Sequence, residues 1–287
     1  MIIKVPATTA NLGPGFDSFG LALSLYLELE ILEKTTTWKI SHDLENIPHD
    51  EKNLMIQVVK KVFPDISAHH IKMTTTIPTA RGLGSSSSAI VAGIELANQL
   101  GNLGLTNQEK VKIATEIEGH PDNVAPAILG KFVVSTMVED AVFYNQHDFP
   151  ACGLITVIPK YELLTSESRG VLPEELSYSE GVMASSIANM ALSFLVANKL
   201  EQATELMTKD LWHEPYRKKL IKEFELVSSL KSQLGFYGAL ISGAGPTILV
   251  LAPTEKTVTI HKELKQRFKE CDVKILKTDL TGVQVIK

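Results

Sequence analysis

The chain has 287 residues, of which 44% are hydrophobic and 21% charged. This composition is typical of a folded globular protein and excludes a disordered chain. Its 28 basic and 33 acidic side chains give a net charge of −5, which argues against general binding to nucleic acid or to an anionic membrane surface. The two cysteines, Cys152 and Cys271, cannot form a disulfide framework. No apolar run approaches the roughly 18 residues of a membrane span and no signal peptide is recognised, so a cytoplasmic location is expected.

The first half of the chain mixes predicted strands and helices. Apolar and polar residues alternate from Leu21 to Ile31, which is typical of a strand with one buried face. The other predicted elements follow in this order: a short N-terminal strand before it, a strand at 38–41, a helix at 53–63, a strand at 70–77, a helix capped by serines 85–88 and ended by Gly101, a helix from Thr106 to Gly119, and strands at 131–138 and 153–158.

After about residue 150 the pattern changes. Helical periodicity fills 180–233, and a Gly-rich strand–turn–strand follows at 238–252, before a polar helix from Thr254 and two short strands. Because strands and helices do not alternate regularly, the sequence favours an α+β fold over a parallel sheet. We therefore expect two domains, at residues 1–150 and 151–287.

The segment PTARGLGSSSS, residues 78–88, lies between a predicted strand and a predicted helix. Gly82 and Gly84 allow backbone conformations that other residues avoid, and they let a ligand approach closely. The N–H groups and positive dipole of the following helix N-terminus suit a polyphosphate, and serine hydroxyls suit Mg²⁺. The other interpretation is a flexible turn before a serine-capped helix.

Three better-known glycine motifs do not match this segment. A P-loop requires Gly-Lys-Ser/Thr at its end, and no lysine is present. A dinucleotide fingerprint requires a third glycine where Ser87 stands, and a nucleophile elbow requires glycine where Ser88 stands. Two more Gly-rich segments occur at 10–17 and 241–248. Each alone is compatible with a tight turn, but three in one chain suggest a shared cleft.

Five segments together resemble the GHMP family of small-molecule kinases, and within it the branch that phosphorylates L-homoserine. They are PATTANLGPGFDSFGLAL (6–23), PTARGLGSSSSA (78–89), GHPDNVAPAILG (119–130), HEPYRKKLI (213–221) and SGAGPT (242–247). The resemblance implies an N-terminal domain similar to ribosomal protein S5 domain 2, a ferredoxin-like C-terminal domain and a homodimer. It also implies ATP- and Mg²⁺-dependent conversion of homoserine to O-phosphohomoserine, a step towards threonine.

The same resemblance implies a substrate site. Asn11 and Asp17 would bind the ammonium group and help to hold the hydroxyl, and Arg169 and Arg217 would clamp the carboxylate. The planar fork of arginine binds carboxylates in bidentate fashion. Thr165 would line the same pocket. Without the matched segments, a turn-capping aspartate and two surface arginines would be the simpler interpretation.

Catalysis is assigned to His120 and Asn123, with Arg217, beside the reacting hydroxyl. Many relatives have an aspartate at the position of Asn123, where it could act as a general base, but an amide cannot remove a proton. Asp122 is adjacent, although sequence alone does not tell which way it points. We therefore expect direct in-line transfer that depends on positioning and electrostatics.

The cofactors implied are ATP and Mg²⁺. Glu118 with Ser86 is the expected metal pair, and Glu116 is an alternative carboxylate. Asn53 would contact the adenine, or simply cap a helix. The residues expected to surround the phosphates are Pro78, Thr79, Ala80, Arg81, Gly82, Leu83, Gly84, Ser85, Ser86, Ser87 and Ser88.

Two other functions stay open at this point. One is a kinase of the same family for another alcohol, such as mevalonate or a sugar. The other is a sensor of nucleotides or metabolites that has kept the fold without catalysis. The one aspartate and two arginines of the predicted site favour an amino acid over an uncharged sugar.

Overall fold

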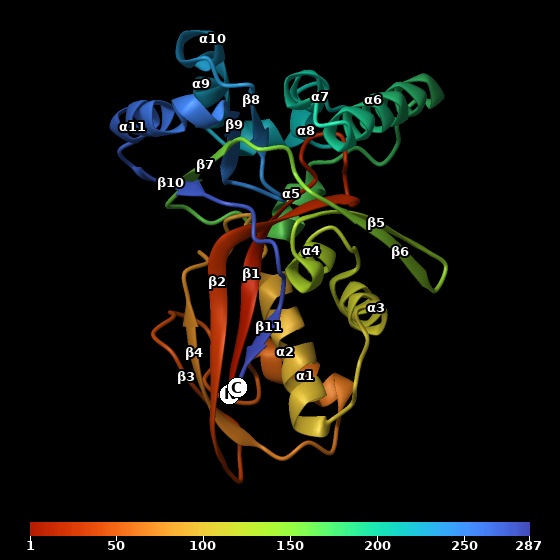
Figure 1. Cartoon of the computed structure of the whole chain (residues 1–287), viewed down its shortest axis with the longest axis vertical. Coiled ribbons are helices and arrows are strands. Elements are labelled where there is room, and N and C mark those ends of the chain that lie inside the picture. The colour runs from red at the N-terminus through yellow and green to blue at the C-terminus, as the bar shows by residue number, and fades with distance from the viewer.

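The long strand β2 (Phe19–Lys34) organises the first half of the chain (Figure 1). The computed structural model describes residues 1–287. Leu21 to Leu29 alternate as predicted towards the core, and β2 pairs with β1 along most of its length. The remaining strands of this seven-stranded sheet are β1 (Ile2–Ala10), β3 (Lys39–Ser41), β4 (His69–Thr75), β5 (Phe132–Val138), β6 (Ala141–His147) and β11 (Gln284–Ile286).

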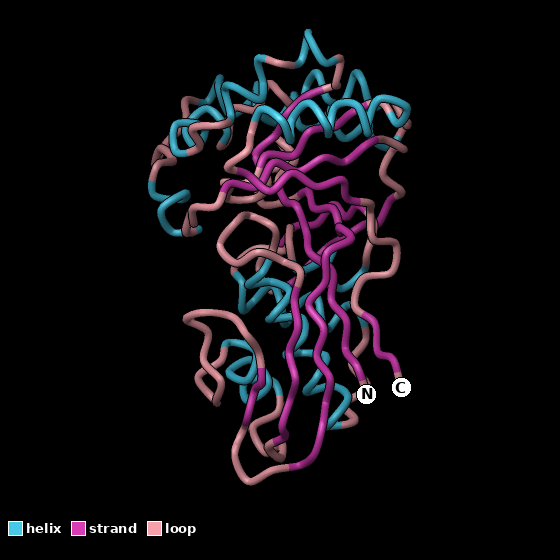
Figure 2. Tube along the Cα trace, turned by 90° about the vertical axis from the view of Figure 1, so that its left-hand side faces the viewer, coloured by secondary structure: helices cyan, strands magenta, loops and turns pink.

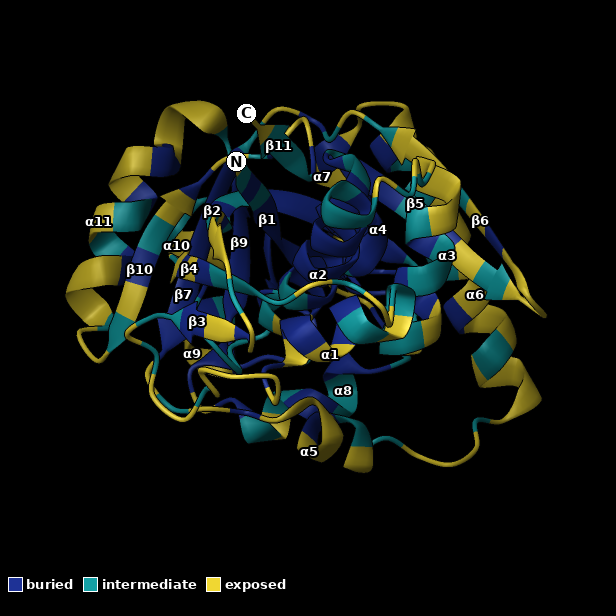
Figure 3. Ribbon diagram, turned by 90° about the horizontal axis from the view of Figure 1, so that it is seen from below, coloured by how far each residue is buried: buried dark blue, intermediate teal, exposed yellow.

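Four helices pack beside this sheet. They are α1 (Leu54–Val62), α2 (Ser85–Gly101), α3 (Asn107–Glu118) and α4 (Val124–Leu129). Figure 3 shows α2 at the centre, largely buried, and it contacts β1 and all three other helices. Its first turn, which follows the glycine–serine loop, is therefore held in place from several sides.

The second half forms a four-stranded antiparallel sheet of β7 (Gly153–Pro159), β8 (Gly238–Ile241), β9 (Ile248–Ala252) and β10 (Cys271–Leu276). The spatial order β10-β7-β9-β8 places the fourth strand beside the first and the third beside the second. With helices in its two crossovers this is the split βαβ arrangement, so the expected ferredoxin-like, α+β fold is confirmed.

Most helices of the second half cover the side of this sheet that faces away from the first half (Figure 2). They are α5 (Thr165–Gly170), α6 (Tyr178–Val196), α7 (Leu200–Met207), α8 (Glu214–Arg217), α9 (Phe224–Ser229), α10 (Lys231–Leu234) and α11 (Thr257–Arg267), with 3₁₀ turns at Lys218–Leu220 and Thr254–Lys256.

The two halves share a hydrophobic core, and the last strand of the chain joins the sheet of the first half. The larger hydrophobic cluster, of 46 buried residues, includes Leu154 and Leu249 of the second sheet together with the apolar face of the first. The last strand, β11, returns to pair with β1. A division at residue 150 therefore separates the strands of the two sheets except for β11, and the shared core explains why no linker is visible in the sequence.

Several local predictions can be compared with the structure. The capping box at Thr106 and the end of that helix at Gly119 are confirmed. The serine cap of α2 is wrong, because Gly84 in a left-handed conformation is the N-cap and the serines form the first turn. Strand β6 and helix α4 were not predicted. In β6 only Val142 is buried, so the strand lacks an apolar alternation.

Helix α6 is long and apolar for a surface element. By length and composition alone it could cross a membrane. An 18-residue window of this helix has a mean hydropathy of 1.2, and only 17% of the window is buried. One such helix is weak evidence, because helices of soluble proteins pass the same test. It begins with a capping box at Ser177 and packs against α7, leaving apolar side chains such as Val182 and Met183 exposed.

Candidate active site

A cavity of about 590 Å³ lies where the two halves meet. One group of lining residues is apolar and comes from β2, the segment before α1, and β4: Leu27, Leu44, Ile47, Pro48, Leu54 and Met73. A second group is polar or charged and comes from both halves: Asn11, Asp17, Glu118, His120, Asp122, Asn123, Arg169 and Arg217. The glycine–serine loop also lines the cavity. An apolar wall suits a flat base, whereas the charged wall suits a charged substrate.

The glycine–serine loop presents its backbone to this cavity. Gly82 and Gly84 have φ values of 73° and 70°, which a side chain would strain. A Cβ on Gly84 would lie 2.1 Å from Thr8 Oγ1. The first N–H groups of α2 have no acceptor within the helix, so the turn at 85–87 offers an anion site. All predicted loop residues line the cavity except Pro78 and the buried Leu83.

The third glycine-rich segment, residues 242–247, supports the loop from behind. Ser242 Oγ donates a hydrogen bond of 2.6 Å to Gly82 O, and the hydroxyl oxygens of Ser242 and Thr9 lie 2.8 Å apart. Gly243 N donates to Ala10 O. Only Gly243 and Ala244 of this segment reach the cavity. The three glycine-rich segments therefore meet, as predicted, but the segment 242–247 mainly supports the glycine–serine loop and contributes little to the cavity wall.

Replacing Gly82 with alanine should disrupt the phosphate loop. A Cβ there would lie 2.2 Å from Ser242 O and 2.8 Å from Gly245 N, both backbone atoms that cannot rotate away. Gly104→Ala is the matched control, because Gly104 has a similar φ of 66° but open space around its Cβ position. We expect the KM for ATP to rise by about tenfold or more in Gly82→Ala, whereas Gly104→Ala should cost only about 1 kcal/mol of stability from backbone strain. Equal effects of the two substitutions on the KM for ATP would contradict the assignment.

Arg81 is held by the second half of the chain. Its Nε donates to Pro159 O at 3.1 Å, Nη1 donates to Thr79 O, and Nη2 donates to Lys160 O. The same guanidinium pairs with Glu162 at 3.3 Å. The guanidinium ties the phosphate loop to the end of β7. Arg81 also lines the cavity, and its contact with ATP stays a prediction.

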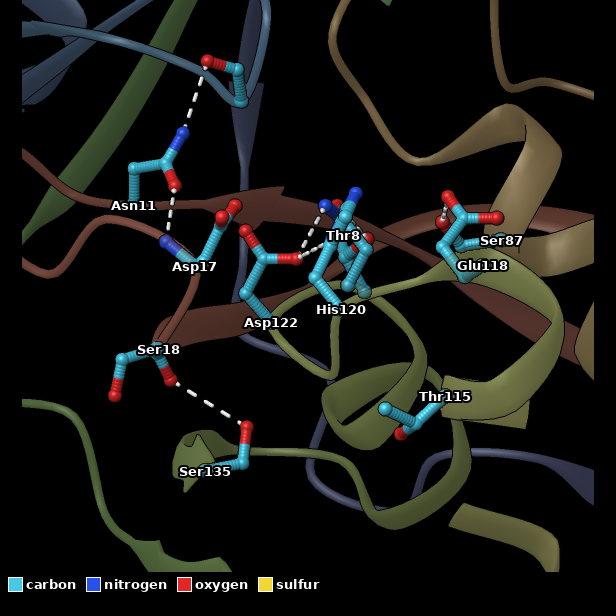
Figure 4. A network of polar contacts seen from close by, with 12 residues as sticks. Thr8, Asn11, Asp17, Ser18, Ser87, Thr115, Glu118, His120, Asp122 and Ser135 are labelled. Carbon is cyan, nitrogen blue, oxygen red and sulfur yellow. Dashed lines mark hydrogen bonds and ion pairs between the residues drawn. The ribbon is translucent and has the colours of Figure 1, made fainter. Parts of the chain in front are cut away.

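The loop between β1 and β2 carries Asn11 and Asp17, both with positive φ. Asn11 Oδ1 accepts from the backbone N–H of Asp17 at 3.1 Å, and Asn11 Nδ2 donates to Gly243 O (Figure 4). Asp17 accepts two hydrogen bonds, of 2.6 and 3.2 Å, from the guanidinium of Arg169. The predicted ligands for the two ends of a zwitterion thus lie together and neutralise each other.

Arg217 is 2% exposed and lines the same end of the cavity. Its Nε donates to Ser168 O at 3.2 Å and its Nη1 to Gly243 O at 3.1 Å. Burial, assisted by the positive charge of Arg169, lowers the pKa of Arg217 to about 10, so the group is still charged at neutral pH. Thr165, the first residue of α5, is exposed where it lines the cavity.

Two of the predicted catalytic residues, His120 and Asn123, lie between α3 and α4, whereas Arg217 is on α8. The carboxylate of Asp122 is buried, and its Oδ1 accepts from His120 Nδ1 and from Asn123 Nδ2. Asn123 Oδ1 accepts from Thr8 Oγ1 at 2.8 Å. Although burial alone lowers the pKa of His120, the hydrogen bond and charge of Asp122 outweigh it and raise that pKa. Asp122 does face the site, so a carboxylate adjoins the amide of Asn123 (Figure 4).

Glu118 and Ser87 form the oxygen pair at the end of α3. Ser87 Oγ donates to Glu118 Oε1 at 2.8 Å, and burial raises the pKa of the Glu118 carboxyl above its usual value. The predicted partner Ser86 also lines the cavity but is exposed and does not bond Glu118, and the metal pair stays a prediction. Glu116 lies outside the cavity and pairs with Lys112. Of the two carboxylates, the geometry favours Glu118.

Asn53 caps α1, as one of its two interpretations predicted. Its Oδ1 accepts from Met55 N and its Nδ2 donates to Pro48 O at 2.9 Å. It also lines the apolar side of the cavity. Both ends of the amide are bonded within the segment from Pro48 to Met55, so Asn53 fixes the shape of this wall.

Four residues of the site were not assigned from the sequence: Thr8, Phe16, Asp122 and His213. Thr8 holds Asn123 from across the sheet, and no local pattern signals such a contact. His213 and Arg217 are four residues apart, the spacing that places two side chains on one helical face. That spacing, in HEPYR (213–217), was the one sequence signal that could have indicated the contact between His213 and Arg217.

Two family models match the chain. GHMP kinases N terminal domain covers residues 53–131, and GHMP kinases C terminal covers residues 191–270. A homoserine kinase of Listeria innocua serovar 6a is 52% identical over 100% of both chains. The crystal structure of homoserine kinase from Cytophaga hutchinsonii is 28% identical, with a TM-score of 0.86, over 100% of this chain and 97% of the other. The Methanococcus jannaschii mevalonate kinase, at 18% identity and a TM-score of 0.71 over 97% and 98%, shares the fold. The chain belongs to the GHMP kinase family and, within it, to the homoserine kinases.

Proposed function

We propose that this protein transfers the γ-phosphoryl group of ATP to the side-chain hydroxyl of L-homoserine, which yields O-phospho-L-homoserine for threonine biosynthesis. The observation that carries the proposal is the meeting of Asp17, Arg169 and Arg217 at one end of a cavity that also contains a helix N-terminus. One carboxylate and two guanidinium groups complement a zwitterion, whereas the free N–H groups of α2 complement a polyphosphate. The family relationship supports the same substrate pair.

Substrate recognition on this proposal is an exchange of ion pairs. Without substrate, Arg169 and Asp17 satisfy each other in a bidentate pair that is about one-third exposed. The ammonium group of homoserine would take the carboxylate of Asp17, and its carboxylate would bridge Arg169 and the buried Arg217. A neutral alcohol cannot compensate either charge, so it would leave the Asp17–Arg169 pair closed.

Phosphoryl transfer on this proposal depends on alignment. Asn123 cannot accept a proton, and its side chain is held by Thr8 and Asp122. The hydroxyl oxygen of homoserine would attack the γ-phosphorus while the bond to the β,γ-bridging oxygen breaks and ADP leaves, and the hydroxyl proton would pass to an oxygen of the transferred phosphoryl group. The N–H groups at the start of α2 would stabilise the negative charge, as expected for a loose transition state. His120 is hydrogen-bonded to Asp122. Its imidazole ring would lie beside the transferred phosphoryl group, where it would offer a positive charge or a hydrogen bond.

Glu118 and Ser87 fit a magnesium ion. Both offer oxygen, the donor that Mg²⁺ prefers, and both line the cavity beside the phosphate loop. Burial raises the pKa of the Glu118 carboxyl, and a bound cation would offset the cost of keeping that carboxylate charged. When bound, Mg²⁺ would neutralise charge on the phosphates of ATP.

A panel of alcohols tests the proposal against its two rivals. The purified chain is assayed with ATP and Mg²⁺ on L-homoserine, mevalonate and a hexose, and phosphorylated product is identified by mass spectrometry. We expect product from homoserine, with a kcat/KM about 100-fold or more above the others because each mismatched charge costs several kcal/mol. A preference for mevalonate would indicate a kinase for another alcohol. Binding of homoserine and ATP without product would indicate a sensor.

The proposed active form is a cytoplasmic homodimer. Exposed apolar side chains gather on α6, including Tyr178, Val182, Met183 and Met190, and a second copy of the same face would cover them. Light scattering after size exclusion should give twice the 31.4 kDa mass of one chain. A mass of one chain at micromolar concentration would exclude the dimer.

A further inference from the structure

His213 makes two side-chain hydrogen bonds in the interior of the protein. The residue is fully buried, its Nε2 lies 3.0 Å from Gly13 O, and its Nδ1 lies 3.3 Å from Arg217 Nη1. A guanidinium group only donates hydrogen bonds. His213 Nδ1 must therefore be the acceptor, which leaves Nε2 to carry the hydrogen and donate it to Gly13 O. This pattern requires the neutral imidazole.

The surroundings of His213 keep it neutral. Burial and the positive charge of Arg217 together outweigh the carboxylates of Asp210 and Asp17 and lower the pKa of His213 to about 4. Asp210 is the nearest carboxylate, 3.6 Å from Nε2. Its oxygens are already used, because they accept the backbone N–H groups of Trp212, His213 and Glu214. Asp210 thus fixes the backbone that leads into α8.

His213 completes a set of acceptors around Arg217. Nε of Arg217 is held by Ser168 O of α5, and Nη1 is shared between Gly243 O and His213 Nδ1. These three acceptors come from three separate segments of the chain. Arg217 Nη2 makes no hydrogen bond within the protein, and the side chain lines the cavity. The geometry therefore points one N–H edge of the fork towards the proposed position of the substrate carboxylate.

Phe16 connects this arrangement to the second arginine. Its ring stacks on His213 with centroids 5.3 Å apart and an angle of 21°. The guanidinium groups of Arg217 and Arg169 lie 5.1 and 5.4 Å from the same ring centroid. An aromatic face attracts cations, so Phe16 helps to hold the two like charges near one point, together with Asp17, which pairs with Arg169. His213 in turn fixes the plane of Phe16.

We propose that His213, through Arg217 and the stacked ring of Phe16, is the positioning residue that aims the guanidinium at the substrate carboxylate and so makes the enzyme prefer an α-amino acid to the same alcohol without its carboxylate. The inference rests on the proposed function, because it takes homoserine as the substrate. His213 itself does not line the cavity, so it acts through its neighbours and not on the reacting atoms.

The test compares L-homoserine with 3-aminopropan-1-ol, which is homoserine without the carboxylate. His213→Phe keeps the ring and the volume but loses both hydrogen bonds, whereas His213→Gln keeps one donor and one acceptor. His261→Phe on α11 is the matched control, because His261 also bonds a backbone carbonyl, Val273 O, but lies outside the cavity. Rates are measured with saturating ATP. In addition, 3-aminopropan-1-ol is titrated as a competitor of homoserine, so that its inhibition constant is obtained even where the enzyme phosphorylates it slowly.

In His213→Phe we expect the KM for homoserine to rise about tenfold or more, since a misaligned fork loses one charge-assisted hydrogen bond. The KM for ATP, the kcat and the inhibition constant of 3-aminopropan-1-ol should stay within about threefold. His213→Gln should recover part of the loss, and His261→Phe should match the wild type. Parallel losses for homoserine and 3-aminopropan-1-ol would overturn the inference, as would an unchanged KM for homoserine in a folded His213→Phe protein. Absence of homoserine turnover in the wild type would instead refute the proposed function.

Discussion

Replacing Arg217 with alanine should raise the KM for homoserine by about 100-fold, which corresponds to about 3 kcal/mol. The guanidinium is buried and held by Ser168 O, Gly243 O and His213, so the variant loses one of the two cations proposed to bind the carboxylate. The other cation, Arg169, is already paired with Asp17. Truncating one partner of a buried charged pair costs about 2–5 kcal/mol. The KM for ATP should change little, because Arg217 lies at the charged end of the cavity and makes no contact with the glycine–serine loop.

Arg217→Lys and Arg267→Ala complete this experiment. Lysine keeps the charge but not the planar fork, so its KM for homoserine should fall between those of the wild type and the alanine variant. Arg267 lies on the surface of α11 and pairs only with Glu263, so Arg267→Ala should leave the KM for homoserine unchanged. A normal KM for homoserine in a folded Arg217→Ala protein would remove Arg217 from the substrate site.

Replacing Glu118 with glutamine should lower the kcat by about 100-fold or more, the range found when a group that stabilises transition-state charge is removed. Glutamine preserves the shape and can still accept from Ser87, but it is a much weaker ligand for Mg²⁺. The Mg²⁺ concentration needed for half-maximal rate should therefore rise, while the KM for homoserine stays near that of the wild type. Titration of initial rate against free Mg²⁺ measures both effects.

The neighbouring residues provide the controls for this experiment. Glu116 is two residues earlier, exposed and paired with Lys112, so Glu116→Gln should behave as the wild type. Ser87→Ala should reproduce part of the Glu118→Gln effect and Ser86→Ala less of it, because only Ser87 bonds Glu118. A lower kcat and a raised Mg²⁺ requirement in Glu116→Gln, with a normal Glu118→Gln enzyme, would reverse the metal assignment.

The sequence predicted those parts of the fold that have a local signature. The alternation from Leu21 to Ile31 specified β2 because one face of that strand is buried. The capping box at Thr106 specified the start of α3 because its two hydrogen bonds are formed within four residues. In contrast, β6 is exposed on most of its length, so local periodicity does not reveal it. The last of the two short strands predicted at the end of the chain is β11, but its pairing with β1 in the first sheet depends on contacts between distant parts of the chain.

The same distinction applies to the site. The residue types and their segments were predicted, including Asp17, Arg169 and Arg217, because a resemblance carries residue identities. Their mutual arrangement was not, since the pairing of Asp17 with Arg169 joins residues 152 positions apart. Which serine hydroxyl meets Glu118 depends on the rotation of α2, which follows a left-handed Gly84. The contact of Ser87 with Glu118 was therefore visible only in three dimensions.

The charge of −5 excludes a broad basic surface, yet the proposed ligands are anions held by a few local groups. The most direct test is therefore the effect of each substrate charge on turnover. The kcat/KM with ATP and Mg²⁺ is measured for L-homoserine, for 4-hydroxybutanoate, which lacks the ammonium group, and for 3-aminopropan-1-ol, which lacks the carboxylate. A site built from Asp17, Arg169 and Arg217 predicts O-phosphohomoserine as the product and a loss of about 100-fold or more for each analogue. Equal turnover of homoserine and either analogue would contradict recognition of a zwitterion by these three residues.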